Sequence, residues 1–323
     1  MSATERELMR PSTESGAERE TTRSGSPTFF GSAQCLDLRL LQAQVAFLGV
    51  PFDQATNDRP GSRFGPLAIR DASMRFRDGI TAGWVDLERG THLLRGVPMA
   101  DCGDVAIRTV DLAENYDTIT AVVRAIRRAG ALPVVIGGDH AITYPVLRAY
   151  DDQRVAIIHF DAHLDFTDEW KGVRLSHDNP LRRAAELPQV VGLIQLGMRG
   201  LERPKVYQDR LKFGSQIVPS YELIRIGAKE ALKRCPPADA YYVTLDIDVL
   251  DPAVAPGTGY PEAGGLNYYQ LKEGLIEAAG KGRIVGFDLV EVNPLFDQAG
   301  ITSRLAARLI LDFLGAIKLR APM

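Results

Sequence analysis

The sequence has few cysteines, no long apolar run and no excess of charge of one sign. Its three cysteines, Cys35, Cys102 and Cys235, stand alone in the chain, and no CxxC pair occurs. This spacing argues against a disulfide framework or a zinc finger and is typical of a protein of the reducing cytoplasm. We therefore predict a cytoplasmic protein.

Segments that would direct the chain to a membrane or to nucleic acid are also missing. No apolar run approaches the ~18 residues typical of a membrane span, and there is no apolar signal-peptide core. The 38 Lys and Arg residues nearly balance the 41 Asp and Glu residues, which leaves a net charge of −3. This balance favours neither nucleic acid nor an anionic membrane as a partner.

Residues 1–28 have almost no large apolar side chains and are rich in Ser, Thr, Glu and Arg. Such a segment cannot bury enough surface to offset the entropy lost on ordering, so we predict a disordered tail. Its five glutamates argue against an organelle transit peptide, which would be poor in acidic residues. Residues 29–323 are expected to form a single domain.

Short, continuous apolar runs alternate with segments of helical periodicity along most of this domain. Strands of a parallel sheet that is covered on both faces have such continuous apolar sequences. The alternation therefore predicts an α/β fold with three layers, α/β/α, around a mostly parallel sheet. The predicted strands are residues 45–50, 132–136, 155–159, 190–196, 241–245 and 284–289, and the longer predicted helices are 69–76, 111–129, 221–232, 267–279 and 301–317.

The most informative stretch is an apolar run that leads into Asp161, His163 and Asp165. In an extended strand, Asp161 and Asp165 would lie ~13 Å apart at Cα, too far to share one metal ion. We therefore expect the strand to end near Phe160 and the chain to curl, so that the three side chains surround one point. For this triplet alone, the alternative is a solvated loop with a helix N-cap.

Three other predicted strand ends carry polar residues that packing does not require. They are residues 137–140, ending in His140, residues 246–248, with Asp246 and Asp248, and residues 286–294, with Glu291. Asp246 and Asp248 share one face of a strand, ~6.6 Å apart at Cα. That spacing suits the two sides of a metal pair, whose ions lie ~3.5–4 Å apart. The alternatives are a structural histidine for His140 and capping or turn roles for the two aspartates.

Four aspartates in one crevice would require counter-charge. Two like charges 4 Å apart repel by ~4 kcal/mol at an effective dielectric constant of 20. Two divalent ions would neutralise the carboxylates, with His140 and His163 as neutral ligands. A set of oxygen and imidazole ligands without thiolate suits Mn²⁺, Ni²⁺, Co²⁺ or Fe²⁺ better than structural zinc. The four carboxylates belong to Asp161, Asp165, Asp246 and Asp248.

Together these motifs resemble the ureohydrolases, the arginase and agmatinase family. The resemblance extends over residues 45–315 in family order and is closer to the agmatinase branch than to the arginases. Shorter matches occur at residues 59–66, 197–200, 255–259 and 300–302. The main motifs are Gly-Gly-Asp-His at 137–140, Asp-Ala-His-Leu-Asp at 161–165, Asp-Ile-Asp-Val-Leu-Asp-Pro at 246–252 and Gly-Phe-Asp-Leu-Val-Glu-Val-Asn-Pro at 286–294.

The resemblance implies an arginase-like fold with a sheet of about eight strands and a single catalytic domain over residues 29–323. It implies two divalent ions per chain, with Mn²⁺ expected and Ni²⁺ as the alternative. Relatives form trimers or hexamers, which implies a homo-oligomer and leaves open an assembly with a paralogous subunit. The implied ligands are His140, Asp161, Asp165 and Asp246 for one ion and Asp161, His163, Asp246 and Asp248 for the other, with Asp161 and Asp246 bridging.

The implied activity is hydrolysis of a C–N bond in a linear amidine, with agmatine and water giving putrescine and urea as the default reaction. A guanidinium ion is stable and permanently charged, so water needs activation, and a metal ion lowers the pKa of water from 15.7 to ~7. Glu291 would offer its two oxygens to the N–H groups of the guanidinium. His177 stands where relatives carry a proton-shuttling histidine, which would protonate the leaving amine.

Two loops depart from the agmatinase pattern, at residues 53–55 and at residues 177–179. Because both would border the substrate, we expect Asp178 and Asn179 to contribute to substrate binding. Asp178 replaces a glycine of the relatives and would attract a distal cation, as in agmatine or a biguanide. Its bulk would narrow the pocket and favour a compact substrate. Alternatively, Asp178 points into solvent and caps a helix that starts near Pro180.

Several alternatives remain for the function. Within the same reaction class, the alternative substrates are guanidinobutyrate, another small guanidine and a biguanide such as metformin. A second class is a non-catalytic subunit of a hetero-oligomer, although all six ligands are retained. A third is a metal deacetylase of similar fold, against which the four motifs and Glu291 argue.

Overall fold

The computed structural model describes residues 27–317 and residue 319. The disordered tail predicted for residues 1–28 therefore lies outside the described residues, except for Pro27 and Thr28. Immediately after them, Phe29 and Phe30 are fully buried against the sheet. Among the described residues, no helix combines the length and the apolar character that crossing a membrane requires.

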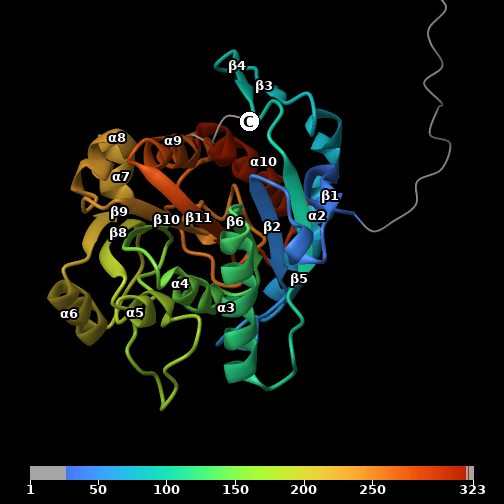
Figure 1. The fold of residues 1–323 in the computed structure, drawn as a ribbon. Coiled ribbons are helices and arrows are strands. Elements are labelled where there is room, and N and C mark those ends of the chain that lie inside the picture. The colour runs from blue at the N-terminus through green and yellow to red at the C-terminus, as the bar shows by residue number, and fades with distance from the viewer. Residues whose placement is uncertain (1–26, 318, 320–323) are drawn as a thin grey trace, which may run out of the picture.

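A nine-stranded sheet forms the centre of the molecule, and all of its neighbouring strands run parallel (Figure 1). The predicted parallel sheet is thus confirmed, with nine strands where about eight were expected. In spatial order the strands are β1 (Ala33–Gln34), β5 (Met99–Asp104), β2 (Val45–Val50), β6 (Leu132–Gly137), β11 (Arg283–Val290), β10 (Ala240–Asp246), β7 (Val155–Phe160), β8 (Val190–Met198) and β9 (Gln216–Pro219).

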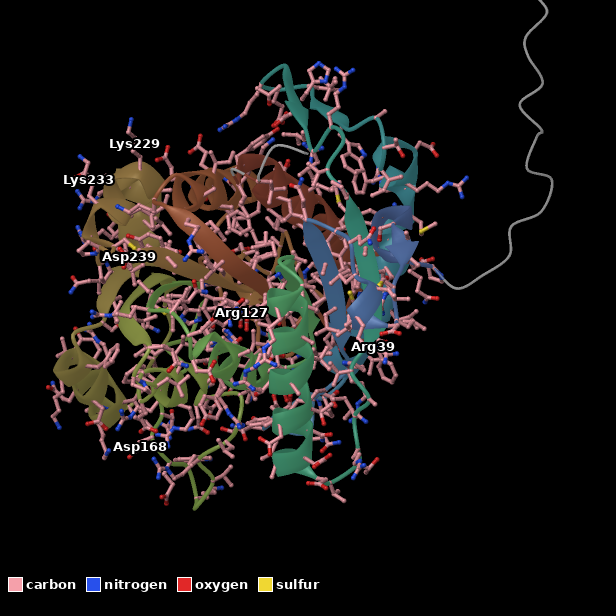
Figure 2. All side chains as sticks on the ribbon, in the orientation of Figure 1. Arg39, Arg127, Asp168, Lys229, Lys233 and Asp239 are labelled. Atoms are coloured by element: carbon pink, nitrogen blue, oxygen red, sulfur yellow. The ribbon has the colours of Figure 1, made fainter. Side chains whose placement is uncertain are left out.

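Helices cover both faces of the sheet, which explains why its strands are apolar on both sides. In β2, Val45 and Phe47 pack into the core on one face, and Ala46 and Leu48 pack into the core on the other. The first face is covered by α2 (Gly65–Ser73), α7 (Ser220–Ile226), α8 (Ala228–Ala231), α9 (Tyr268–Ala279) and α10 (Ile301–Ala316). The second is covered by α3 (Leu112–Arg128), α4 (Thr143–Leu147), α5 (Pro180–Ala184) and α6 (Pro204–Phe213). Charged side chains such as Lys229, Lys233 and Asp239 project from the outside (Figure 2).

Some elements differ from the prediction. The helix predicted over residues 221–232 is divided at Gly227, whose φ of 79° interrupts the helical backbone between α7 and α8. The strands β1, β5 and β9, the helix α6 and a small hairpin of β3 (Trp84–Asp86) and β4 (Thr91–Leu93) were not predicted. β5 was missed because it contains polar residues, and its buried Asp101 is paired with Arg70 of α2.

The strand order brings distant parts of the sequence together. The last two strands, β10 and β11, lie between β6 and β7, so that the four central strands run in the order β6-β11-β10-β7. Because these strands are parallel, their carboxyl ends meet at one edge of the sheet, where α/β proteins place their ligand sites. The four polar motifs of the sequence all follow these four strands.

Candidate metal centre and active site

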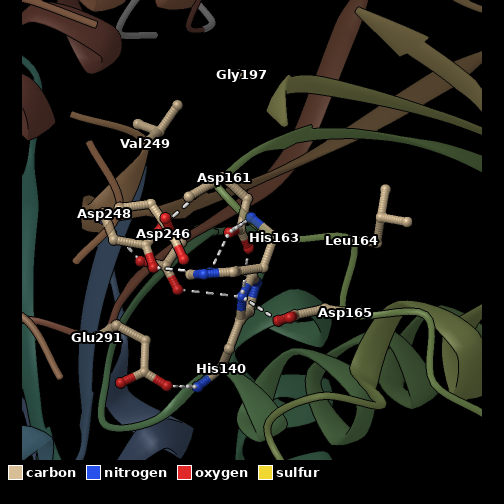
Figure 3. A network of polar contacts seen from close by, with 12 residues as sticks. His140, Asp161, His163, Leu164, Asp165, Gly197, Asp246, Asp248, Val249 and Glu291 are labelled. Atoms are coloured by element: carbon tan, nitrogen blue, oxygen red, sulfur yellow. Dashed lines mark hydrogen bonds and ion pairs between the residues drawn. The ribbon is translucent and has the colours of Figure 1, made fainter. Parts of the chain in front are cut away.

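The chain leaves β7 as predicted, because the strand ends at Phe160 and the residues after it form a tight turn. Oδ1 of Asp161 accepts a hydrogen bond from the backbone N–H of His163, at 2.5 Å. Asp165 has a φ of 49°, a left-handed conformation that reverses the direction of the chain. The turn therefore directs Asp161, His163 and Asp165 toward the ends of the neighbouring strands (Figure 3).

His140 and three carboxylates form the first group of possible ligands (Figure 3). Nδ1 of His140 lies 3.0 Å from Oδ2 of Asp161, 2.8 Å from Oδ2 of Asp165 and 3.4 Å from Oδ2 of Asp246. Ligand atoms that share an ion at ~2.1 Å and meet at right angles lie ~3 Å apart. These separations therefore fit four ligands of one divalent ion.

His163 and two carboxylates form the second group. Nδ1 of His163 lies 3.0 Å from Oδ2 of Asp248 and 3.5 Å from Oδ1 of Asp161. Asp161, His163 and Asp248 have ligand atoms close enough to bind one ion. Asp161 takes part in both groups. Oδ1 of Asp246 accepts a hydrogen bond from the backbone N–H of Asp248 at 2.8 Å, which places Asp246 next to the second group. The structure thus brings all six predicted ligands together.

The hydrogen bonds on the Nε2 side of His140 determine the tautomer of the ring. They indicate that Nδ1 carries a lone pair, which faces the carboxylates. The Thr244 hydroxyl donates to Oδ1 of Asp288 at 2.5 Å, so its oxygen accepts from Nε2–H of His140 at 2.9 Å. Asp288 also accepts from Thr143 and Tyr242. In this tautomer, Nδ1 carries no proton and has no hydrogen-bond partner. A buried lone pair among three carboxylates suits a cation between them.

The electrostatics of the cluster indicate the same need for positive charge. Burial lowers the pKa of His140, but Asp161 and Asp165 outweigh it and raise the pKa well above its usual range. Burial and the charge of Asp248 raise the pKa of Asp246 well above the ordinary value. Burial and the charge of Asp161 raise the pKa of Asp165 to about 7. A pair of divalent ions would supply the charge that the carboxylates otherwise take from protons.

His159 is a residue of this centre that the sequence analysis missed. It lies in β7 two positions before Asp161, and its Nε2 donates to Oδ2 of Asp161 at 2.7 Å. Nδ1 accepts from the amide of Gln195 at 3.2 Å, and that amide is oriented by Ser215. His140, His159 and Asp161 also have ligand atoms close enough to share an ion, but both ring nitrogens of His159 are engaged in hydrogen bonds, so we infer that His159 orients Asp161. The shared face of residues i and i+2 in a strand was the available signal.

Arg199 holds the loop that carries Asp248. Located just after β8, it donates to five backbone carbonyl groups, at Gly197, Asp248, Val249, Leu250 and Glu262. A glycine is required at position 197, which has a φ of 98°, because a side chain would collide with Val249 and the carbonyl of Asp161. These contacts join the turn after β7 to the loop after β10.

A cavity of about 340 Å³ opens beside the ligand cluster. Glu291 forms part of its wall and adopts a φ of 62°, which turns the side chain toward His140 and His177. Oε1 of Glu291 accepts from the backbone N–H of His140 at 2.9 Å and lies 3.2 Å from Nδ1 of His177. The lining also includes Asn57, Thr167, Trp170, Asp178, Leu201, Glu202, Arg203 and Tyr260.

The two residues that follow His177 have different surroundings. Asp178 lines the cavity and accepts from the side chain of Asn57 at 2.8 Å. The cap position of α5 is Asn179, without a side-chain capping bond, so the alternative in which Asp178 caps this helix is not realised. Asn179 is fully buried and does not line the cavity. Its side chain accepts from Ser176 and donates to the carbonyl of Thr167, and thus supports the loop.

The fold and the cluster define an α/β/α protein whose strand ends can bind a pair of divalent ions. The chain belongs to the arginase family, whose sequence model matches residues 43–315. Enzymes of this family depend on a binuclear metal centre and hydrolyse C–N bonds of guanidino compounds. The predicted family and reaction class are therefore confirmed.

Individual relatives cover most of the chain. The chain is 34% identical to guanidinopropionase of Pseudomonas aeruginosa, over 90% of this chain and 91% of that protein. It is 35% identical to mitochondrial agmatinase of Gallus gallus, over 84% and 80% of the two chains. Among solved structures, proclavaminate amidino hydrolase of Streptomyces clavuligerus superimposes with a TM-score of 0.81, at 33% identity, over 91% of this chain and 97% of that one.

Proposed function

We propose that the protein is an agmatinase-like enzyme that hydrolyses agmatine to putrescine and urea. The observation that carries this proposal is the distribution of charge along the cavity. Glu291 is buried beside the ligand cluster, the more exposed Asp178 and Glu202 also line the cavity, and Arg203 is the only Lys or Arg residue of the lining. Agmatine has a cation at each end, so this pattern is complementary to it. The similarity to a protein named agmatinase supports the same choice.

We assign the roles of the ligands as the sequence motifs suggested. Asp161 and Asp246 would bridge the two ions, which we propose to be Mn²⁺, with Ni²⁺ as the alternative. When bound, two divalent ions supply a nucleophile from water at neutral pH. One ion would be held by His140, Asp161, Asp165 and Asp246, and the other by Asp161, His163, Asp246 and Asp248.

Glu291 would act on the guanidinium side of the C–N bond that breaks, and His177 would act on its amine side. Oε1 of Glu291 is already engaged with His140 and His177, which leaves Oε2 for the guanidinium N–H groups. A charged hydrogen bond of this kind orients the planar substrate. His177 lies next to Glu291 and would give a proton to the amine as the C–N bond breaks. Asp178 contributes its charge to the substrate cavity, and Asn179 acts on the substrate only through the loop.

A second candidate substrate is a guanidino acid such as guanidinobutyrate. Arg203 lines the cavity, stacks over the Trp170 ring at 4.6 Å and donates to the Thr167 hydroxyl at 2.7 Å. A guanidinium held in this way is suited to pair with a distal carboxylate. The similarity to a protein named guanidinopropionase favours this candidate as well.

The deciding experiment is a panel of guanidino compounds assayed with Mn²⁺-loaded and Ni²⁺-loaded protein, with urea and amine both measured. We expect the highest kcat/KM for agmatine, with equal amounts of urea and putrescine. A higher value for guanidinobutyrate would support the second candidate. A higher value for guanidine or a biguanide would show that the narrow pocket selects compact substrates, and would overturn both proposals.

We further propose a cytoplasmic homo-oligomer, a trimer or hexamer, whose catalytic domain spans residues 29–323. The isolated cysteines support the compartment, and the family match over residues 43–315 supports the single domain. Sedimentation of the purified chain tests the assembly. A monomer that becomes active only after addition of a paralogous subunit would instead support a hetero-oligomer.

A further inference from the structure

His177 is held between two loops that are far apart in the sequence. Its Nδ1 lies 3.2 Å from Oε1 of Glu291, on the side of the ligand cluster. Its Nε2 has two neighbours of opposite kind, the backbone N–H of Asn57 at 3.1 Å and Oδ1 of Asp178 at 3.4 Å. An N–H group can pair only with an unprotonated Nε2, whereas a carboxylate can pair only with Nε2–H.

Asn57 also holds Asp178 in place. Its side-chain amide donates to Oδ2 of Asp178 at 2.8 Å, which leaves Oδ1 free to face the imidazole. The same two loops are joined by the backbone N–H of His177, which donates to the carbonyl of Ala55 at 3.1 Å. Asn57 and Asp178 therefore form one unit around Nε2, which we call the Nε2 clamp.

We propose that Asn57 and Asp178 are positioning residues that control the protonation of His177 at Nε2. The backbone N–H of Asn57 stabilises the neutral ring, and the carboxylate of Asp178 stabilises the protonated ring at the same atom. The ring can thus gain or lose a proton without rotating, while Nδ1 stays directed at Glu291. The inference rests on the proposed role of His177 as the acid for the leaving amine. It assigns Asp178 a function toward His177 in addition to its place in the cavity lining.

The other charges around His177 determine the direction of the effect. Burial lowers its pKa, but Glu291, Asp178 and Asp139 outweigh burial and raise it to about 10. Divalent ions bound nearby would act in the opposite direction to these carboxylates. Because Asp178 favours the protonated ring, removing its charge must lower the pKa of His177. The proposed acid works only when it is protonated. With a lower pKa it loses its proton at a lower pH, so the fall in activity on the alkaline side begins earlier.

The test is the pH profile of kcat/KM for the Asp178→Asn variant. A neighbouring opposite charge shifts a pKa by ~1–3 units, and Asp178 is about one-third exposed, so we expect the lower end of that range. The alkaline limb should move down by ~1 pH unit, by the same amount with cationic and anionic substrates. Asn57→Ala retains the backbone N–H but releases Asp178, and should move the limb in the same direction by less.

The matched control is Asp58→Asn, which removes one carboxylate charge from the residue that follows Asn57 in the sequence. Asp58 is exposed and paired with Arg59, so its variant should keep the profile of the native enzyme. If His177→Gln is inactive while Asp178→Asn leaves the limb in place, the Nε2 clamp is refuted and the role of His177 stands. Full activity of His177→Gln would refute that role itself. A change in substrate preference without a shift of the limb would show that Asp178 acts on the substrate, and would also overturn the inference.

Discussion

Two residues of the site, Asp165 and Glu291, have left-handed backbones with φ of 49° and 62°. Such conformations cost a non-glycine residue ~1–3 kcal/mol and persist only where the surrounding structure enforces them. Here the enforcing contacts are hydrogen bonds, from Leu181 N–H to the carbonyl of Asp165 and from Glu291 N–H to the carbonyl of Gly138. Each strained residue directs its carboxylate into the cluster or the cavity, so the strain coincides with the proposed chemistry.

At this scale the bridging assignment makes a clear prediction. Asp246 is proposed to bind both ions and Asp248 only one, although Asp246 ends β10 and Asp248 follows it by two residues. Asp246→Ala should therefore lose both ions, whereas Asp248→Ala should keep about one per chain. Elemental analysis of the purified variants measures the difference. A ratio near two metals per chain in Asp246→Ala would contradict the bridging role.

The proposed acid makes a second prediction. His177→Ala should retain both ions and the fold, because its contacts are with the cavity residues and not with the ligands. Its kcat should fall by ~10²–10⁴, the usual loss for a positioned acid–base group. The control is His92→Ala, an exposed histidine of β4. Unchanged turnover of the His177 variant at neutral pH would show that the histidine is only structural.

At the scale of elements, Arg199 connects three of the segments that form the site. We expect Arg199→Leu to loosen the loop that carries Asp248 and to weaken the second ion, held by His163 and Asp248, by ~10–100-fold. The first ion should be unaffected. Competitive metal titration, read as ion affinity, measures both sites. Lys205→Leu, an exposed change in the following helix, is the control, and equal losses from both sites would argue against this role.

A second prediction at this scale concerns the first part of the chain that the structure describes. Arg70 of α2 is buried, binds Asp101 of β5 at 2.9 Å and stacks on Phe29 at 4.3 Å. Arg70→Met should lower the free energy of unfolding by ~3–5 kcal/mol, because Asp101 would keep a buried, unpaired charge. Urea unfolding measures this value. The exposed pair of Arg39 and Asp37 is the control, because solvent screens it, and Arg39→Met should leave the free energy of unfolding nearly unchanged.

For the whole molecule, the metal cluster links binding to stability. Ligands that bind only the native state stabilise it, by ~2.7 kcal/mol at 100 times Kd. From the unfolding entropy per residue, 1 kcal/mol corresponds to ~1.5–2 °C in a chain of this size, and the effects of two ions add. We therefore expect chelation to lower the Tm by roughly 5–10 °C and Mn²⁺ to restore it. Calorimetry with and without chelator measures the shift, and an unchanged Tm would show that the cluster binds no ion under those conditions.

The local features of the site were determined by the sequence alone. Asp161, His163 and Asp165 are close in the chain, and the end of β7 at Phe160 followed from their spacing. Continuous apolar strands predicted parallel packing, and the carboxyl ends of parallel strands meet at one edge. The motifs after β6, β7, β10 and β11 could therefore be placed together before their order in the sheet was known. The family followed from those same motifs.

What only the tertiary structure decided depends on contacts between distant residues. The insertion of β10 and β11 between β6 and β7 has no local signal, nor does β5, whose Asp101 is neutralised by Arg70 from another element. The direction of the loop after β7 was open as well. Its Asp178 faces Asn57, 121 residues away in the sequence, and not the helix that follows. Side-chain direction in a loop is set by such partners, which periodicity and composition cannot encode.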